Sequence, residues 1–194
     1  MAVGPSAEKP VSRRSRVLGW IRLGLVYVFV GFLILQSKPT PALLAAGALL
    51  VGIGEWVRIW AAGHLVKSVR LITSGPYSYT QNPLYLGRLL ILTGLGIAAR
   101  SVAYLNLAAL GLGYLVFFLY YMPRKLRVEG ARLASLHGAD FERYNAIVPI
   151  LFPTLHRYAG DRAPWSFRRM VGNQELLVSA GLVVVLVALV LRLP

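Results

Sequence analysis

Five long apolar runs dominate the sequence and limit what the chain can fold into. They cover residues 17–36, 42–62, 84–99, 102–122 and 176–193. A helix needs about 20 apolar residues to cross the hydrocarbon core of a bilayer, and all but the third run are close to that length. The pattern therefore predicts an all-α integral membrane bundle of about five transmembrane helices.

The composition agrees with a membrane protein of one domain. Of the 194 residues, 57% are hydrophobic and 14% are charged, whereas charged residues make up about 25% of a typical soluble domain. Residues 1–15 form a polar, basic tail, and residues 16–194 are expected to form a single domain. Cysteine is absent, which excludes disulfides, thiolate metal sites and cysteine nucleophiles.

Positive charges are distributed unevenly between the loops, and the net charge is +14. One side of the membrane would carry the basic residues of the tail and of the loops after the second and fourth runs: Lys9, Arg13, Arg14, Arg16, Arg22, Lys67, Arg70, Arg124, Lys125, Arg127, Arg132, Arg143, Arg157, Arg162, Arg168 and Arg169. The other side keeps only Lys38, Arg100 and Arg192. Because cytoplasmic loops are rich in Lys and Arg, we expect the N-terminus and the basic loops in the cytoplasm, as in a bacterial inner-membrane protein. The expected partner of these charges is the lipid bilayer rather than nucleic acid.

The segment between the second and third runs, residues 63–83, is the first candidate for function. It contains Gly75-Pro76 and Asn82-Pro83, which are both strong turn signals. Each proline restricts its own backbone and that of the residue before it. We therefore expect a rigid loop at the cytoplasmic membrane surface.

The segment between the fourth and fifth runs, residues 123–173, is the second candidate. Residues 124–137 have a partial apolar face, which predicts a cytoplasmic helix lying on or under the bundle. His137-Gly138 is a typical helix stop, and residues 140–144 are expected to form one more helical piece. This segment is thus predicted to lie outside the membrane-spanning runs.

Ionisable residues inside membrane helices are costly and are therefore candidates for function. Glu55 and Arg58 are three residues apart in the second run, so their side chains would meet on one helix face. Two interpretations stay open for this pair. It either braces the bundle as a buried ion pair, or it lines a polar ligand pocket.

Glycines and histidines give two further expectations. Close helix contact in lipid is favoured by five glycines of the third and fourth runs, so these runs are expected to form a tight hairpin: Gly87, Gly94, Gly96, Gly111 and Gly113. His64, His137 and His156 lack the spacing of metal ligands. We therefore expect no metal site.

Two stretches of the chain resemble the isoprenylcysteine carboxyl methyltransferase family, a group of membrane methyltransferases related to phospholipid N-methyltransferases. The first stretch reads RIWAAGHL over residues 58–65 and TSGPYSYTQNPLYLG over residues 73–87. The second stretch contains Glu129 and Leu133, His137-Gly138, Phe141 and Tyr144, and Val148-Pro149. The resemblance covers about residues 50–155, which is over half of the chain.

The resemblance implies an enzyme that binds S-adenosylmethionine in a pocket closed by the first loop and the glutamate helix. The positions that match cofactor-contacting residues of the family are His64, Leu65, Gly75, Pro76, Tyr77, Gln81, Asn82, Pro83, Tyr85, Leu86, Glu129 and Leu133. A lipid or small lipophilic acceptor would reach the methyl group from the bilayer and accept it on oxygen or nitrogen. Lys125 or Arg127 is the candidate to hold a carboxylate of the acceptor.

Two departures from the family pattern keep other functions open. The family usually has Arg-His-Pro or Arg-Asn-Pro where this chain has Gln81-Asn82-Pro83. The family also often has two glutamates where this chain has Glu129-Gly130. One alternative is a non-catalytic cofactor-binding or structural membrane protein of the same fold. A less favoured alternative is a sterol-type membrane reductase with a nicotinamide cofactor, for which the first loop offers only Lys67 and Arg70 as phosphate-binding cations.

Overall fold

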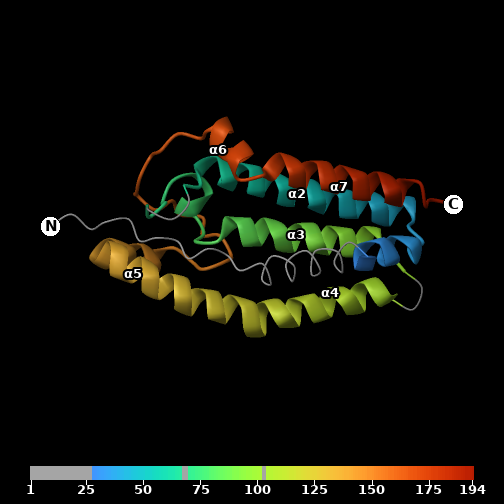
Figure 1. Ribbon diagram of the computed structural model, residues 1–194, viewed down its shortest axis with the longest axis horizontal. Coiled ribbons are helices and arrows are strands. Elements are labelled where there is room, and N and C mark those ends of the chain that lie inside the picture. The colour runs from blue at the N-terminus through green and yellow to red at the C-terminus, as the bar shows by residue number, and fades with distance from the viewer. Residues whose placement is uncertain (1–27, 67–69, 102–103) are drawn as a thin grey trace, which may run out of the picture.

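The computed structural model describes residues 28–66, 70–101 and 104–194, and within these ranges the regular secondary structure is helical, with no strand. The helices lie roughly side by side in an elongated molecule (Figure 1). This confirms the predicted all-α class. The tail 1–15, residues 17–27 of the first run and Lys67 lie outside the described residues, and the part of the first run that is described is helical over 28–35.

Two helical stretches are long and apolar enough to cross a membrane by length and composition. They are α2, Pro41–His64, and the continuous stretch Leu105–Ile147. The helices α3, Pro83–Ala98, and α7, Glu175–Val190, are apolar but have only 16 residues each. The described residues thus support two spans, and the predicted count of about five is not confirmed.

The closest helix contact is between α2 and α3, and glycines make it possible. A Cβ atom added to Gly54 would lie 2.6 Å from the carbonyl oxygen of Gly87, and Gly47 and Gly94 meet in the same way one repeat further along. Gly111, in α4, has open space around it instead. The predicted tight hairpin of the third and fourth runs is present in part, because Gly96 packs against Leu110 of the fourth run. The contact of glycine against glycine, however, is between α2 and α3, since two backbones come this close only where both helices lack side chains at the crossing.

The helix predicted over residues 124–137 is present, and it continues directly from the fourth run. Helix α4, Leu105–Val116, continues through a π-helical turn, η3, Phe117–Tyr121, into α5, Met122–Ile147. Pro123 lies at the start of α5 and would clash with the carbonyl of Leu119 in a regular α-helix. The wider π turn just before it provides the room, so the chain passes the proline without ending the helix.

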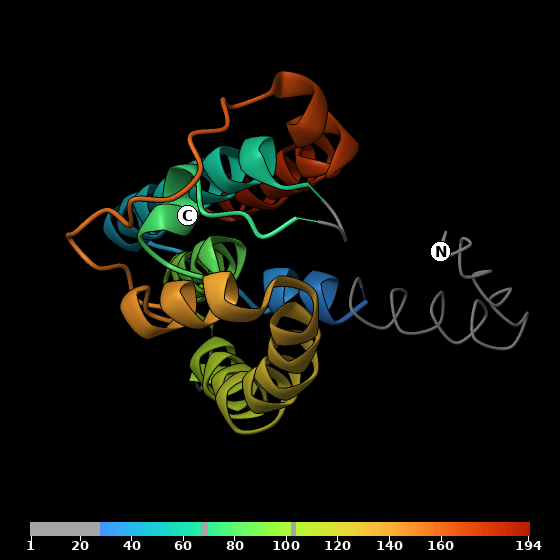
Figure 2. The ribbon, with the colours of Figure 1, turned by 90° about the vertical axis from the view of Figure 1, so that its left-hand side faces the viewer.

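The expected stop at His137-Gly138 corresponds to a kink in α5. Gly138 has φ 48° and ψ −124°, which is not helical, so two helical pieces meet there. Positive φ is readily adopted by glycine because it has no Cβ atom. Figure 2 shows the resulting change of direction, and the second piece contains the residues 140–144 predicted to be helical.

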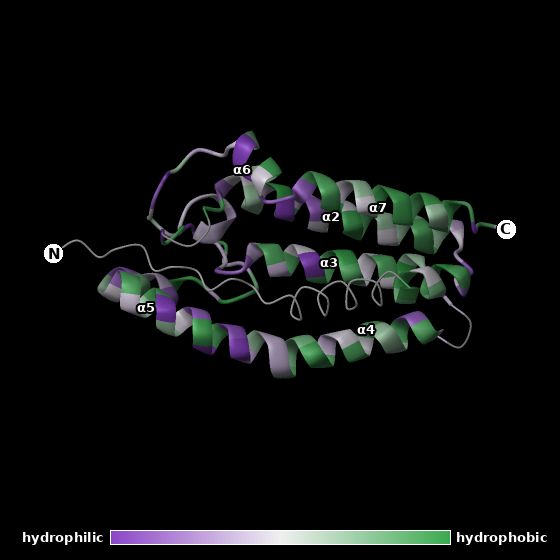
Figure 3. Ribbon diagram, viewed as in Figure 1, coloured by the Kyte–Doolittle hydropathy of each residue, from purple (hydrophilic) through white to green (hydrophobic). Residues whose placement is uncertain are grey.

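The chain after α5 folds back over the end of the molecule that carries the 3-10 turn η1, Gly75–Ser78. The short helix α6, Phe167–Gly172, was not expected; Ser166 caps it by accepting a hydrogen bond from the Arg169 backbone. Hydrophilic residues are frequent on α5 and α6, whereas α7 is apolar along most of its length (Figure 3). We call the end with η1 and α6 the loop end, and the end with the C-terminus the opposite end.

Candidate functional site

The His64 cavity is a hollow of about 220 Å³ at the loop end. His64 is the last residue of α2, and its Nδ1 atom is hydrogen-bonded to the Ser74 hydroxyl at 3.2 Å. Gly75 has φ +60°, and a Cβ atom there would collide with the His64 ring. Glycine is therefore required both by the backbone conformation and by the close approach of the ring. Trp60 and Tyr79 line the same cavity and supply aromatic surface.

Residues 78–82 are held by the segment that follows α5. The backbone amide of Gln81 donates to the Pro149 carbonyl at 2.9 Å, and the Thr80 hydroxyl donates to the Leu151 carbonyl at 2.9 Å. The Gln81 side chain donates to the carbonyl of Val148 at 2.7 Å. Gln81 thus ties the loop to the end of α5, a contact for which a neutral amide suffices.

Asn82 joins the two candidate segments. It precedes α3, where Pro83 begins the helix as the turn signal predicted. Its side-chain amide donates to the Ile150 carbonyl at 2.8 Å, and its side-chain oxygen accepts a hydrogen bond from Lys125 Nζ at 2.5 Å. The side chain is therefore fixed in one orientation from both sides.

Lys125 is surrounded by predicted site residues. Its ammonium group lies 3.1 Å from a carboxylate oxygen of Glu129 and 4.2 Å from the centre of the Tyr85 ring. The Tyr85 hydroxyl shares a hydrogen bond of 2.9 Å with Tyr121, a contact that the sequence did not indicate. We call Asn82, Tyr85, Lys125 and Glu129 the Asn82 cluster; it brings together residues more than 40 positions apart in the chain.

The Asn82 cluster keeps part of its charge accessible. The Lys125 side chain is 21% exposed and the Glu129 side chain is 50% exposed. A surface ion pair of this kind contributes little to stability, because water screens it and two long side chains must be ordered. The accessible carboxylate keeps capacity to accept further hydrogen bonds.

Tyr77 lies in η1, the turn whose residues Gly75 and Ser78 line the His64 cavity. It is buried, and Tyr144 donates a hydrogen bond of 2.8 Å to its carbonyl. Burial raises the pKa of its hydroxyl, and the nearby Tyr144 and Glu129 raise it further. Tyr77 is thus a neutral hydroxyl within electrostatic range of Glu129.

Other predicted site residues have structural contacts or lie apart. Leu133 packs with Phe141, Tyr144 and Val148, and Leu86 packs with Leu89, Met122 and Leu151. The remaining positions serve as caps, turns or surface: Leu65 caps α2, Pro76 and Pro83 are buried at helix starts, and Arg127 is exposed on α5.

The predicted residues therefore form two groups rather than one pocket. His64 and Gly75 line the cavity, while Asn82, Lys125 and Glu129 form the cluster, and within the described ranges the lining of the cavity includes none of those three. The cavity is also lined by Arg157 and Arg162. The sequence did not predict that these two residues line the cavity, because they lie in an irregular loop. No local periodicity connects such a loop to a helix 90 residues earlier.

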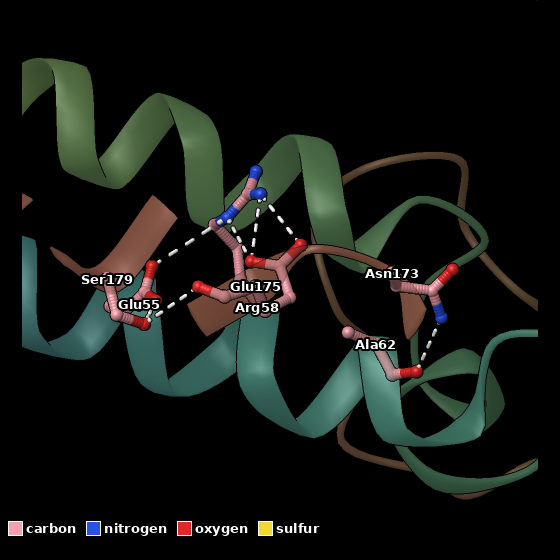
Figure 4. Close-up of polar contacts among 6 residues, drawn as sticks. All are labelled: Glu55, Arg58, Ala62, Asn173, Glu175 and Ser179. Atoms are coloured by element: carbon pink, nitrogen blue, oxygen red, sulfur yellow. Dashed lines mark hydrogen bonds and ion pairs between the residues drawn. The ribbon is translucent and has the colours of Figure 1, made fainter. Parts of the chain in front are cut away.

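Glu55 and Arg58 form a network with residues of α7 (Figure 4). The Arg58 guanidinium donates to both carboxylate oxygens of Glu175, with distances of 2.8 and 2.9 Å from one of its terminal nitrogens, whereas Glu55 lies 3.8 Å away. The Ser179 hydroxyl donates to the Glu55 carboxylate. We call these four residues the Arg58 network. The sequence missed Glu175, although an acid at the start of a helix is a typical stabilising position.

Comparison with known proteins defines the class. Residues 42–129 match the family model "Phospholipid methyltransferase", so the chain carries a domain of a membrane methyltransferase class. The matched region contains α2, η1 and α3 and ends at Glu129, and it thus includes every member of the Asn82 cluster. The predicted class of membrane methyltransferases is confirmed, whereas the assignment to the isoprenylcysteine branch is not confirmed by this match.

The chain belongs to the same protein family as the cobalt-zinc-cadmium resistance protein CzcN of Cupriavidus metallidurans, to which it is 31% identical over 202 residues, spanning 94% of this chain and 89% of CzcN. It is also 33% identical over 122 residues to the nickel-cobalt-cadmium resistance protein NccN of Alcaligenes xylosoxydans xylosoxydans. That match spans 62% of this chain and 54% of NccN. No solved structure matches the chain.

Proposed function

We propose that the protein is an S-adenosylmethionine-dependent methyltransferase that acts on a lipid or small lipophilic acceptor in a membrane. The observation that carries the proposal is the Asn82 cluster: it lies inside the matched methyltransferase domain, and it joins two segments that the family resemblance singles out. The loop end, which is rich in basic side chains, would face the cytoplasm, where the cofactor is dissolved.

The residues present fit the polar parts of this cofactor. Glu129 has an accessible carboxylate that would accept hydrogen bonds from ribose hydroxyls or an ammonium group, and Lys125 would pair with a carboxylate. The His64 cavity, with Trp60 and Tyr79, would accept a flat aromatic base. When bound, S-adenosylmethionine supplies an activated methyl group on a sulfonium.

The contribution of the protein would be positioning rather than covalent chemistry. Methyl transfer requires the donor carbon and the accepting atom in line, and orientation alone can supply a large part of the rate enhancement. Asn82 and Lys125 suit this role because each is held by several contacts before any ligand binds. A preorganised site loses less entropy when the ligand is bound.

Calorimetry of the detergent-purified chain with S-adenosylhomocysteine tests the proposal. We expect saturable binding that Glu129→Ala weakens by about 1.5–3 kcal/mol, the range for a hydrogen bond to a charged group. Glu142→Ala is the matched control, because Glu142 is an exposed acid of α5 beyond the kink. A folded chain with no binding at millimolar ligand would end the methyltransferase proposal and favour a structural membrane protein of the same fold.

The names of CzcN and NccN suggest a biological setting for this activity. We propose that the chain contributes to tolerance of divalent metals by methylating a membrane component. The proposal rests on the family membership and on the Asn82 cluster. Expression in a cobalt- and cadmium-sensitive bacterium should raise the tolerated metal concentration, and Glu129→Ala should abolish the gain while Glu142→Ala keeps it. Equal tolerance with Glu129→Ala would separate metal tolerance from methyl transfer.

A further inference from the structure

The opposite end of the molecule contains a pocket of about 530 Å³. This volume lies in the range of small-molecule binding sites. Its lining includes Lys38, Arg100 and Arg192, which are the three basic residues that the charge pattern predicts for the side with few positive charges. They are far apart in the sequence, and the fold brings all three to one place.

Backbone hydrogen bonds hold these residues together. The backbone amide of Lys38 donates to the Arg100 carbonyl at 2.6 Å, and the guanidinium of Arg192 donates to the Leu35 carbonyl at 2.9 Å and to the Ser37 carbonyl at 3.3 Å. An isolated antiparallel β-bridge between Ser37 and Ser101 joins the same two segments of the chain. The backbones of Lys38 and Arg100 are thus held together directly, and the Arg192 side chain is fixed against the backbone of Leu35 and Ser37.

The positive charge of the pocket is not neutralised by acidic side chains. Within residues 28–66, 70–101 and 104–194, no Asp or Glu lines the pocket, and Lys38, Arg100 and Arg192 take part in no ion pair. Three positive charges also exceed the single negative charge that a terminal carboxylate at Pro194 would carry there. Because the three cations repel one another, an anionic ligand that binds among them is favoured.

The surroundings of the pocket favour an anion with apolar chains. Leu35 is 67% exposed and Leu191 is 80% exposed, and both are next to residues that form the pocket. Tyr104, which lines it, is also exposed, and tyrosine is typical of the membrane interface. If α2 crosses the membrane, its length of 24 residues separates the loop end from this pocket by about 36 Å, close to the distance between the two headgroup layers.

We propose that this pocket binds the phosphate of an anionic phospholipid in the leaflet opposite to the loop end. Lys38 and Arg100 contact the phosphate, Arg192 both closes the pocket and adds charge, and the acyl chains lie on the exposed leucines beside it. This site is separate from the proposed methyltransferase site and does not depend on it. A bound lipid would join the chain around residue 37, the α3–α4 connection and the C-terminal end.

Native mass spectrometry of the full chain in detergent, with phosphatidylglycerol added, tests the proposal. Each cation near a membrane surface contributes enough to change affinity about fivefold, so Lys38→Gln/Arg100→Gln should weaken binding roughly 25-fold. The matched control is Arg143→Gln/Arg168→Gln, which removes two exposed cations of the loop end. Lys38→Arg/Arg100→Lys keeps both charges and should retain binding. If the neutral pair fails to fold, the single variant Lys38→Gln should still show the fivefold loss.

Three outcomes would overturn the proposal. Binding of phosphatidylglycerol that is equal in Lys38→Gln/Arg100→Gln and in the control pair would exclude the pocket. Binding of inorganic phosphate as tight as that of phosphatidylglycerol would show a free-anion site with no use for acyl chains. Equal binding of phosphatidylcholine, which is zwitterionic, would show that the net charge of the lipid is not recognised.

Discussion

The Arg58 network and the Asn82 cluster both pair a cation with a carboxylate, yet they differ in burial. In the network, Arg58 is 7% exposed and Glu175 is 3% exposed. In the cluster, half of the Glu129 side chain is accessible. Each charge of a buried pair has lost its water and must be compensated by the other charge. The charges of an accessible pair can exchange partners with water or a ligand. Burial, more than pairing, therefore separates the group that braces the helices from the group suited to bind a ligand.

This comparison answers the question that the sequence left open about Glu55 and Arg58. The guanidinium of Arg58 is bound by Glu175 of α7, and the Ser179 hydroxyl of the same helix binds Glu55. Neither residue lines the His64 cavity. The structure thus favours the interpretation that the pair holds α2 and α7 together.

The largest expected effect is that of Glu175→Ala on stability. Removing Glu175 leaves the buried Arg58 with only the Glu55 carboxylate at 3.8 Å, and breaking a buried pair in this way costs about 3–5 kcal/mol of unfolding free energy. Denaturant unfolding in detergent, followed by circular dichroism, measures it, with Glu142→Ala as an exposed control. The triple variant Glu55→Gln/Arg58→Met/Glu175→Leu leaves no buried charge in the Arg58 network and should recover much of the loss. A loss below about 1 kcal/mol for Glu175→Ala would contradict the bracing role.

Gly87→Ala should come next, because it acts on the helix contact that supports both regions. A Cβ atom there would lie 2.5 Å from the Gly54 carbonyl oxygen and 2.6 Å from Cγ of Arg58. Overpacking of this kind costs about 1–3 kcal/mol. Gly52→Ala, at a position of α2 with open space, is the matched control and should not destabilise the chain. Equal stabilities of the two variants, measured by thermal unfolding, would refute the glycine contact.

Lys125→Met should separate binding from stability. The side chain is partly exposed, so we expect a change in unfolding free energy below about 1 kcal/mol. Affinity for S-adenosylhomocysteine should fall about tenfold, since one charge-assisted hydrogen bond is lost. The matched control is Arg143→Met, which removes an exposed cation elsewhere on α5. A stability loss as large as that of Glu175→Ala would place Lys125 with the bracing residues.

The smallest effect is expected for Gly130→Ala. Gly130 is a helical residue of α5, and an added Cβ atom would meet nothing within 4 Å. Alanine should therefore raise the unfolding free energy by about 0.5–1 kcal/mol through helix propensity alone. Affinity for S-adenosylhomocysteine should stay unchanged, because Gly130 takes no part in the cluster. A stability loss would show that the glycine makes a contact that its position does not suggest.

The sequence alone determined the features that depend on neighbouring residues. Apolar runs predicted the helical class, Asn82-Pro83 marked the start of α3, and Gly138 marked the kink in α5. These follow from the backbone preferences of proline and glycine and from helical periodicity. The family motifs also selected Asn82, Tyr85 and Glu129, which the fold brings together around Lys125.

Only the tertiary structure decided which distant residues meet. It made Glu175 the partner of Arg58, placed Gly87 against Gly54 rather than against the fourth run, and carried the helix past Pro123 through a π turn. It also gathered Lys38, Arg100 and Arg192 in one pocket. Local propensity acts over a few residues, whereas these contacts depend on how whole helices pack, and that packing is set by the combined burial and pairing of many side chains at once.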